Sequence, residues 1–301
     1  QLRNDDLRWE TTSQVDVGID FGLFNNRISG EIDYYVKSTD GLLLNVNIPA
    51  TTGFSSMVKN IGKLENKGYE FVLNTQNLVG AFKWTTNFNV ALNQGKVTDI
   101  QGQVIEGGVG SMNRVQEGYA IGVYYTAEWA GVDPANGNAL WYKNTKLADG
   151  TIDRTKTSVY SQATRVVTGN PNPDVVLGLT NNFSYKKFTA SFFFNAVTGF
   201  VVYNNTANAL LLKGSLKNAK NVTRDVVNSI ENSINPGNVS TRFLEKGDYI
   251  RLANASLSYA LDVKQGSFIK GLNLTLSGQN LALFTKYSGL DPEVNVDKSR
   301  N

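Results

Sequence analysis

Two carboxylates on neighbouring predicted strands are the first residues whose chemistry needs an explanation. Residues 14–37 alternate apolar and polar side chains on both sides of Asn25-Asn26, and a tight turn there pairs Asp20 with Glu31. Facing carboxylates are the acid and base of many glycosidases. Like charges also face each other across strands when water lies in front of them. We favour this second interpretation, in which neither residue is catalytic.

Two loop segments resemble ligand-binding loops. Residues 133–138 (DPANGN) place oxygen-bearing side chains near a glycine, as calcium loops do, but they lack the bidentate glutamate at the expected distance, so we interpret them as a turn. Residues 102–110 are glycine-rich but lack the Lys-Ser/Thr pair of a phosphate loop. The chain has no cysteine and no histidine, which excludes thiolate metal sites, disulfides and Ser-His or Cys-His catalysis. We expect no metal, no cofactor and no enzymatic activity.

Aromatic residues in one long predicted loop are the best candidates for ligand contact. Flat rings stack on sugar faces or clamp peptide side chains, and they combine apolar area with a polar tip. The alternative is that the rings pack the loop against neighbouring loops or against a partner protein. The candidates are Tyr124, Tyr125, Trp129, Trp141 and Tyr142.

The elements that position these residues are predicted by strict two-residue periodicity. In the first hairpin the turn register and the hydrophobic pattern agree, and a slip of one residue would invert both faces. The same alternation recurs along the chain and predicts an all-β, antiparallel fold with eight long strands. Their ranges are 14–24, 27–37, 67–77, 81–92, 174–185, 188–198, 249–261 and 271–283.

Each strand has one apolar and one polar face. If the sheet is part of a membrane barrel, the apolar rows face lipid and the polar rows face the lumen. The lipid-facing candidates are Val15, Val17, Ile19, Phe21, Ile32, Tyr34, Phe88, Phe192 and Phe194. The lumen-facing candidates are Asp16, Asp20, Glu31, Asp33, Asn87 and Asn89.

Connection lengths alternate strictly between short and long. The short ones are 25–26, 78–80, 186–187 and 262–270, and the long ones are 38–66, 93–173 and 198–248. All short turns therefore lie at one end of the sheet and all long loops at the other. Outer-membrane barrels have short periplasmic turns, long extracellular loops, strands of about 9–11 residues and aromatic residues near the membrane boundaries.

The long loops contain predicted structure of their own. Residues 118–129 are extended and aromatic, and they lead into a hairpin whose Asn-Gly turn lies at 136–137. Apolar residues at helical spacing over 222–234 predict a short amphipathic helix.

Composition sets further limits on function. The 301 residues are 41% hydrophobic and 18% charged, without the run of about 20 apolar residues that a membrane-spanning helix needs. A net charge of +3 with scattered lysines argues against nucleic acid as a partner. A secreted or surface β-sandwich that binds carbohydrate or protein remains the alternative, with its apolar rows packed on a second sheet.

Several stretches resemble the C-terminal part of SusC/RagA-type TonB-dependent outer-membrane transporters. They are spread over nearly the whole chain in the family's order. They are LRWETTSQVDVGIDFGLFNNRISGEIDYYVKSTDGLL (7–43), NIGKLENKGYEFVLN (60–74), GVDPANGNALWY (131–142), GNPNPDVVLGLTNNFSYKKFTASFFFNAVTG (169–199), RFLEKGDYIRLANASLSYAL (242–261) and LTLSGQNLALFTKYSGLDPEV (274–294).

The resemblance implies a barrel of about 22 strands closed around a plug. Residues 1–301 would then be part of a longer polypeptide, with the plug, the first half of the barrel and the last strand outside this chain. It further implies a bacterial outer-membrane protein, surrounded by lipid and lipopolysaccharide, that imports a glycan or an oligopeptide. The implied partners are a SusD-like surface lipoprotein, which covers the long loops, and the energy-supplying TonB complex.

Overall fold

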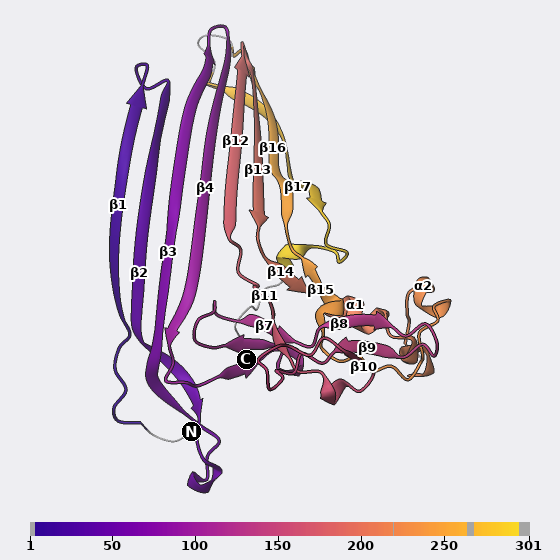
Figure 1. Cartoon of the computed structure of the whole chain (residues 1–301). Coiled ribbons are helices and arrows are strands. Elements are labelled where there is room, and N and C mark those ends of the chain that lie inside the picture. The colour runs from indigo at the N-terminus through magenta and orange to yellow at the C-terminus, as the bar shows by residue number, and fades with distance from the viewer. Residues whose placement is uncertain (1–3, 219, 264–267, 295–301) are drawn as a thin grey trace.

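A computed structural model describes residues 4–218, 220–263 and 268–294, and its main feature is one antiparallel sheet (Figure 1). Neighbouring strands of this sheet, here called the wall, follow the order β1-β2-β3-β4-β12-β13-β16-β17. Their bounds are β1 (Thr11–Leu23), β2 (Ile28–Asn47), β3 (Ser56–Val79), β4 (Phe82–Asp99), β12 (Val175–Tyr185), β13 (Phe188–Thr198), β16 (Tyr249–Leu261) and β17 (Leu272–Thr285). All eight predicted strands are confirmed. The short connection predicted at 262–270 lies partly outside the described residues.

The first turn has the predicted geometry. Asn25 and Asn26 have φ values of 55° and 61°, which fit a tight hairpin turn, and Arg27 N–H donates to the Phe24 carbonyl at 3.3 Å. The resulting register pairs Ile19 with Ile32, as the hydrophobic pattern predicts. The turn and the pattern therefore specify the same register.

The long loop predicted at 38–66 is wrong. The two strands that flank this region, β2 and β3, instead continue into it, and only residues 48–55 connect them. Register shifts occur between Asp40 and Leu43, and Gly41 has a φ of 72°. These bulges break the two-residue alternation, which is why the sequence pattern missed the extension. Strand β4 likewise continues to Asp99, seven residues beyond its predicted end at 92.

The sheet forms a single layer. Val17 and Ile19 are 64% and 67% exposed, so no second sheet packs on the apolar face in the described part of the chain. The three smaller sheets are formed by segments of the long connections, and in Figure 1 they lie below the lower ends of β12 and β13, whereas β2 and β3 extend farther down. The β-sandwich alternative is therefore wrong. Among the described residues, no helix has the length and the apolar character needed to span a membrane.

The two longest connections fold into a separate structure, here called the loop body (residues 100–174 and 199–248). The first connection contains β5 (Ile105–Gly107), β6 (Asn113–Val115), β7 (Val123–Thr126), β8 (Trp129–Val132), β9 (Ala139–Tyr142), β10 (Lys156–Thr157) and β11 (Val166–Gly169). The second contains β14 (Val201–Tyr203), α1 (Asn205–Leu210), α2 (Arg224–Val227) and β15 (Leu244–Lys246). Short 3-10 turns lie at Ala50–Thr52, Val109–Ser111, Tyr160–Gln162, Lys213–Asn218, Thr241–Phe243 and Pro292–Val294.

The predicted hairpin of the first connection is confirmed by the pairing of β8 with β9. The helix predicted over 222–234 is much shorter, because α2 has four residues. Polar side chains end it: the Ser229 hydroxyl donates to the Val226 carbonyl at 2.8 Å, and Ser and Asn favour such local bonds over a continuing helix. Helix α1 was not predicted, although Asn204 caps it by accepting a bond from Ala207 N–H at 2.8 Å.

The buried core lies mainly in the loop body and at its junction with the sheet. One cluster combines both connections and contains Met112, Tyr124, Tyr203, Val239 and Phe243. Burial raises the pKa of Tyr203 to about 12. A second cluster surrounds Trp141, and a third joins Phe200 and Val202 to Tyr249 on the wall. The loop body is therefore a packed domain with its own core.

Candidate functional site: the sheet faces and the loop body

The predicted lumen-facing residues lie on one face of the sheet. Ladder pairing places Asp20 opposite Glu31 and Asp33 opposite both Gly18 and Glu70. Asp16 lies two positions from Gly18 on β1, so it shares this face. A Cβ on Gly18 would lie 1.9 Å from Asp33 Oδ1, so the side chain of Asp33 covers this glycine. The face therefore carries an acidic band across β1, β2 and β3.

The same face is rich in amides farther along the sheet. Asn87 lies opposite Asn74 and donates to its Oδ1. Asn89 lies opposite Gly178, and its amide covers the space that a Cβ would take there. The side-chain amides give this face both hydrogen-bond donors and acceptors.

The predicted lipid-facing residues share the opposite face. The ladder joins Ile19 to Ile32, Phe88 to Leu179, and Leu179 to Phe194. The members of this face that were predicted from the sequence are Val15, Val17, Ile19, Phe21, Ile32, Tyr34, Phe88, Phe192 and Phe194. The row is continuous across the sheet.

One polar row interrupts the apolar face near the short turns. Asn77 Nδ2 donates to Thr86 Oγ1 at 2.8 Å, and Thr86 Oγ1 donates to Asn181 Oδ1 at 2.8 Å. Trp84 Nε1 donates to the same Asn181 oxygen at 2.9 Å. These groups satisfy one another, which lowers the cost of placing them on an apolar surface. Stacked aromatic rings, including Phe82 and Phe183, lie beside the row.

Two of the five aromatic candidates for ligand contact are buried. Tyr124 is 2% exposed and its hydroxyl accepts a bond from Tyr203 N–H at 3.3 Å. Trp141 is 1% exposed and packs edge-on against Trp129 and Tyr160. The prediction of ligand contact is wrong for these two residues, because they form the core of the loop body.

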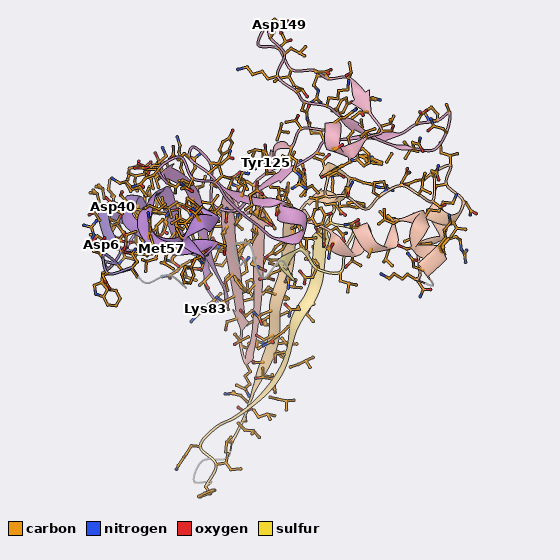
Figure 2. All side chains as sticks on the ribbon, turned by 90° about the horizontal axis from the view of Figure 1, so that it is seen from below. Asp6, Asp40, Met57, Lys83, Tyr125 and Asp149 are labelled. Atoms are coloured by element: carbon orange, nitrogen blue, oxygen red, sulfur yellow. The ribbon has the colours of Figure 1, made fainter. Side chains whose placement is uncertain are left out.

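The other three aromatic candidates are half-buried, and each carries an arginine over its ring. Arg114 lies 3.3 Å from the ring centre of Tyr125, Arg154 lies 4.2 Å from that of Tyr142, and Arg242 lies 4.6 Å from that of Trp129. Cation–π contacts of this kind fix the guanidinium groups. Tyr125 lies within the loop body, whereas Asp149 lies at its far tip (Figure 2). Each arginine is also ion-paired with a glutamate, Arg114 with Glu106, Arg154 with Glu128 and Arg242 with Glu231, so its charge is largely neutralised and it covers one face of the ring.

The turn at 133–138 uses its oxygens internally. Asp133 Oδ1 accepts a bond from Ala135 N–H at 2.9 Å, and Asp133 Oδ2 accepts one from Asn136 Nδ2 at 2.9 Å. Gly137 has a φ of 75°, a conformation that favours glycine. These contacts belong to a tight turn.

The tip of this turn docks the first connection onto the second. Gly137 C=O accepts bonds from Asn232 N–H at 2.7 Å and from Asn235 Nδ2 at 2.9 Å. A Cβ on Gly137 would lie 2.2 Å from the Ile230 carbonyl oxygen, so only glycine fits. Asn235 Oδ1 also accepts a bond from Ala139 N–H at 2.9 Å. The contact is made by main chain and amides together.

A buried ion pair supports this junction. Arg242 donates to both carboxylate oxygens of Glu231, at 2.7 and 2.8 Å, and Glu231 is 5% exposed. The same guanidinium covers Trp129 from the first connection. Beside it, Thr241 N–H donates to the Ala127 carbonyl at 3.0 Å. Apart from Trp129, none of these residues was singled out from the sequence, because more than 100 residues separate the two connections at this contact and no local pattern marks it.

Glu117 gives the loop body a pH-dependent contact. Its Oε1 accepts bonds from Ile100 N–H at 2.9 Å and from Gly102 N–H at 3.0 Å, and these bonds lower the pKa of Glu117. A lowered folded-state pKa means that the stabilisation is present above the ordinary glutamate pKa and is lost as pH falls through the folded value.

We therefore expect Glu117→Gln to reduce protection of the Ile100 and Gly102 amides from hydrogen exchange at neutral pH. In the wild type, these two amides should become as weakly protected as in the variant only in acid, where Glu117 is protonated. The amides of Asn232 and Thr241, which are bonded elsewhere, serve as controls. Equal protection of Ile100 and Gly102 in both proteins at neutral pH would contradict the assignment.

Comparison with known proteins identifies the family. The model of the TonB dependent receptor-like β-barrel family matches residues 1–281. The chain belongs to the TonB-dependent receptor family. A TonB-dependent receptor of Formosa agariphila is 34% identical over 99% of this chain, and the TonB-dependent receptor SusC of Bacteroides thetaiotaomicron is 32% identical over 97% of it. The chain spans 32% and 30% of the lengths of these receptors.

Solved structures of related receptors have the same fold. The RagAB peptide transporter matches with a TM-score of 0.83 at 28% identity, covering 96% of this chain and 33% of that one. The closed-closed state of the RagAB peptide importer matches with a TM-score of 0.80 at 29% identity, with the same coverage. Because TonB-dependent receptors of the SusC and RagA type are outer-membrane β-barrels, the TonB-dependent receptor described here is an outer-membrane protein of a transporter family. The recognition of the family from sequence is confirmed.

Proposed function

We propose that this chain forms part of the wall and surface loops of a transporter that imports a large nutrient across the outer membrane. The nutrient is a glycan or an oligopeptide, and TonB supplies the energy. The observation that carries the proposal is a single-layer sheet whose two faces differ in polarity, joined to a packed loop body at one end. Similarity to RagAB, a peptide transporter, supports it.

The two faces have different roles in this proposal. The apolar row contacts lipid tails and lipopolysaccharide, because a barrel presents its apolar residues outwards. The acidic and amide rows, including Asp20, Glu31 and Asn87, line the passage and hold water. Residues 1–301 supply eight strands, roughly a third of a closed barrel of about 22, and the rest of the polypeptide supplies the plug and the other strands.

The loop body contacts cargo and a lid. A SusD-like surface lipoprotein covers it, and Tyr125, Trp129 and Tyr142 meet the cargo or that lipoprotein. The partial exposure of these three rings supports this assignment. Tyr124 and Trp141 act only by keeping the loop body folded.

The test uses the full-length transporter in its own outer membrane. We expect uptake of its nutrient to stop when TonB is deleted or the proton gradient is collapsed, and a surface lipoprotein to copurify with the transporter in mild detergent. Analysis of the small molecules bound to that complex then identifies the cargo class. Uptake that continues at the same rate without TonB would show that the proposal is wrong.

A further inference from the structure

The wall has an opening where β4 extends beyond β12. The ladder between them ends with Leu92 opposite Val175, and Asn93 N–H makes one more bond, to the Asp174 carbonyl at 3.2 Å. Farther along β4, Val97 N–H donates to the Tyr119 carbonyl at 2.8 Å and Val97 C=O accepts from Gly118 N–H at 2.8 Å. The edge of β4 is thus hydrogen-bonded at two places, to Asp174 at Asn93 and to residues 118–119 at Val97.

Gly95 lies between these two bonded positions. Along an extended strand, the N–H and C=O groups of every second residue point to the same side, so Gly95 presents both groups to the side on which Asn93 and Val97 are bonded. In the described chain, no hydrogen bond to Gly95 crosses the opening. Both edges of the opening belong to this chain, so the gap lies within the described wall.

A cavity of about 630 Å³ occupies the opening. This is within the range of roughly 300–1,000 Å³ that is typical of ligand sites. Its lining includes the amides Asn66, Asn93, Gln94, Asn170 and Asn172 and the charged residues Glu65, Lys67, Lys96 and Asp174. The surroundings of Gly95 are therefore rich in hydrogen-bonding groups, with amides beside charges of both signs.

The amides of this lining are held in place by the protein. Asn172 Nδ2 donates to the Ile121 carbonyl at 2.8 Å and to Asn170 Oδ1 at 3.0 Å, and Asn93 Oδ1 accepts a bond from the Tyr35 hydroxyl at 3.1 Å. A site whose polar groups are already oriented loses little entropy on binding.

The geometry at Gly95 points to one class of ligand. In an antiparallel ladder, two residues exchange both of their main-chain hydrogen bonds, so the N–H and C=O of Gly95 are matched by the N–H and C=O of one residue of another extended chain. Sugar hydroxyls have no such fixed pair. We propose that the opening binds a short, extended peptide by antiparallel pairing with Gly95, the mode of β-strand addition. That this peptide is imported cargo rests on the proposed function.

The first test measures binding of acetyl-trialanine-amide to the full-length transporter in detergent by calorimetry. The matched ligand control is the same peptide with its three alanine nitrogens methylated, which removes the N–H donors. We expect the methylated peptide to bind about tenfold more weakly, because it leaves the Gly95 carbonyl unpaired. Equal affinity for the two peptides would overturn the inference.

The matched protein variants are Gly95→Ala and Gly95→Pro. Alanine keeps the N–H, and its Cβ would meet only the Asn66 Oδ1 tip, at 2.7 Å, which rotates away. Proline removes the N–H. We expect Gly95→Ala to bind the peptide within about threefold of wild type and Gly95→Pro to bind about tenfold more weakly.

A measurement on the wild type keeps the inference testable if Gly95→Pro does not fold. Hydrogen exchange of Gly95 N–H should slow at least tenfold when acetyl-trialanine-amide is added, while that of Val97 N–H, already bonded, should stay the same. Slow exchange of Gly95 before any peptide is added would mean that another part of the protein fills the opening, and the inference would be wrong. Uptake that still depends on TonB would in that case leave the proposed function standing.

Discussion

Replacing Phe192 by arginine is expected to lower the stability of the transporter in a lipid bilayer by about 2–4 kcal/mol. Phe192 is the fifth of the eleven residues of β13 and lies on the apolar face, opposite Asn181 and Ala255. If this face contacts lipid, as proposed, an arginine there places a charge inside the membrane, where it has no water. The free energy of unfolding of the full-length protein in vesicles, measured by guanidinium titration, checks this.

The neighbouring residue provides the control. Ser191 lies on the opposite face of the same strand, paired with Asn182 and Ser256, so Ser191→Arg places its charge on the polar face of the sheet. We expect this variant to change stability by less than about 0.5 kcal/mol, as surface substitutions usually do. Equal costs for the two variants would mean that the apolar face does not contact lipid.

The second large effect is expected from Glu231→Gln. The substitution leaves Arg242 buried beside a neutral group, and losing one partner of a buried ion pair costs about 3–5 kcal/mol. Because the pair supports the docking of the two connections, we expect the free energy of local unfolding of the loop body to decrease. Hydrogen exchange of Asn232 N–H and Thr241 N–H, which are bonded across that junction, reports the free energy of local opening.

An exposed ion pair gives the matched comparison. Lys63 and Asp40 lie 3.3 Å apart with both side chains well exposed, so Asp40→Asn should change stability by less than about 1 kcal/mol. A double variant that replaces Glu231 and Arg242 by methionine and leucine should regain part of the loss, since it removes the unpaired charge. An unchanged exchange rate in Glu231→Gln would show that the junction is held by its main-chain bonds alone.

The wall was predictable because its pattern is local. Alternation over 14–37 and the turn at Asn25-Asn26 fix the same register, and each prediction checks the other. The extension of β2 and β3 was not predictable in this way, because bulges near Gly41 interrupt the alternation while the hydrogen-bonded ladder continues. The pattern indicates which face each side chain occupies, so it cannot detect a strand beyond a bulge that reverses the alternation.

The loop body was predictable only in part for a different reason. The hairpin of β8 and β9 follows from its Asn-Gly turn, but the burial of Trp141 depends on Tyr160 and on the docking of a distant segment. Tyr124 and Tyr125 are adjacent in the chain, yet the first is core and the second is half-exposed. Residue type alone cannot distinguish a packing aromatic from a ligand-binding one.

The close fit of Gly137 against Ile230 also limits which substitutions this chain tolerates. The carbonyl of Ile230 occupies the space where any larger residue at position 137 would project its first carbon, so sequence drift on one side of the contact demands a compensating change on the other. Chimeras that graft a single surface segment from a relative would inherit mismatched halves. A chimera that keeps this contact should exchange residues 100–174 and 199–248 together.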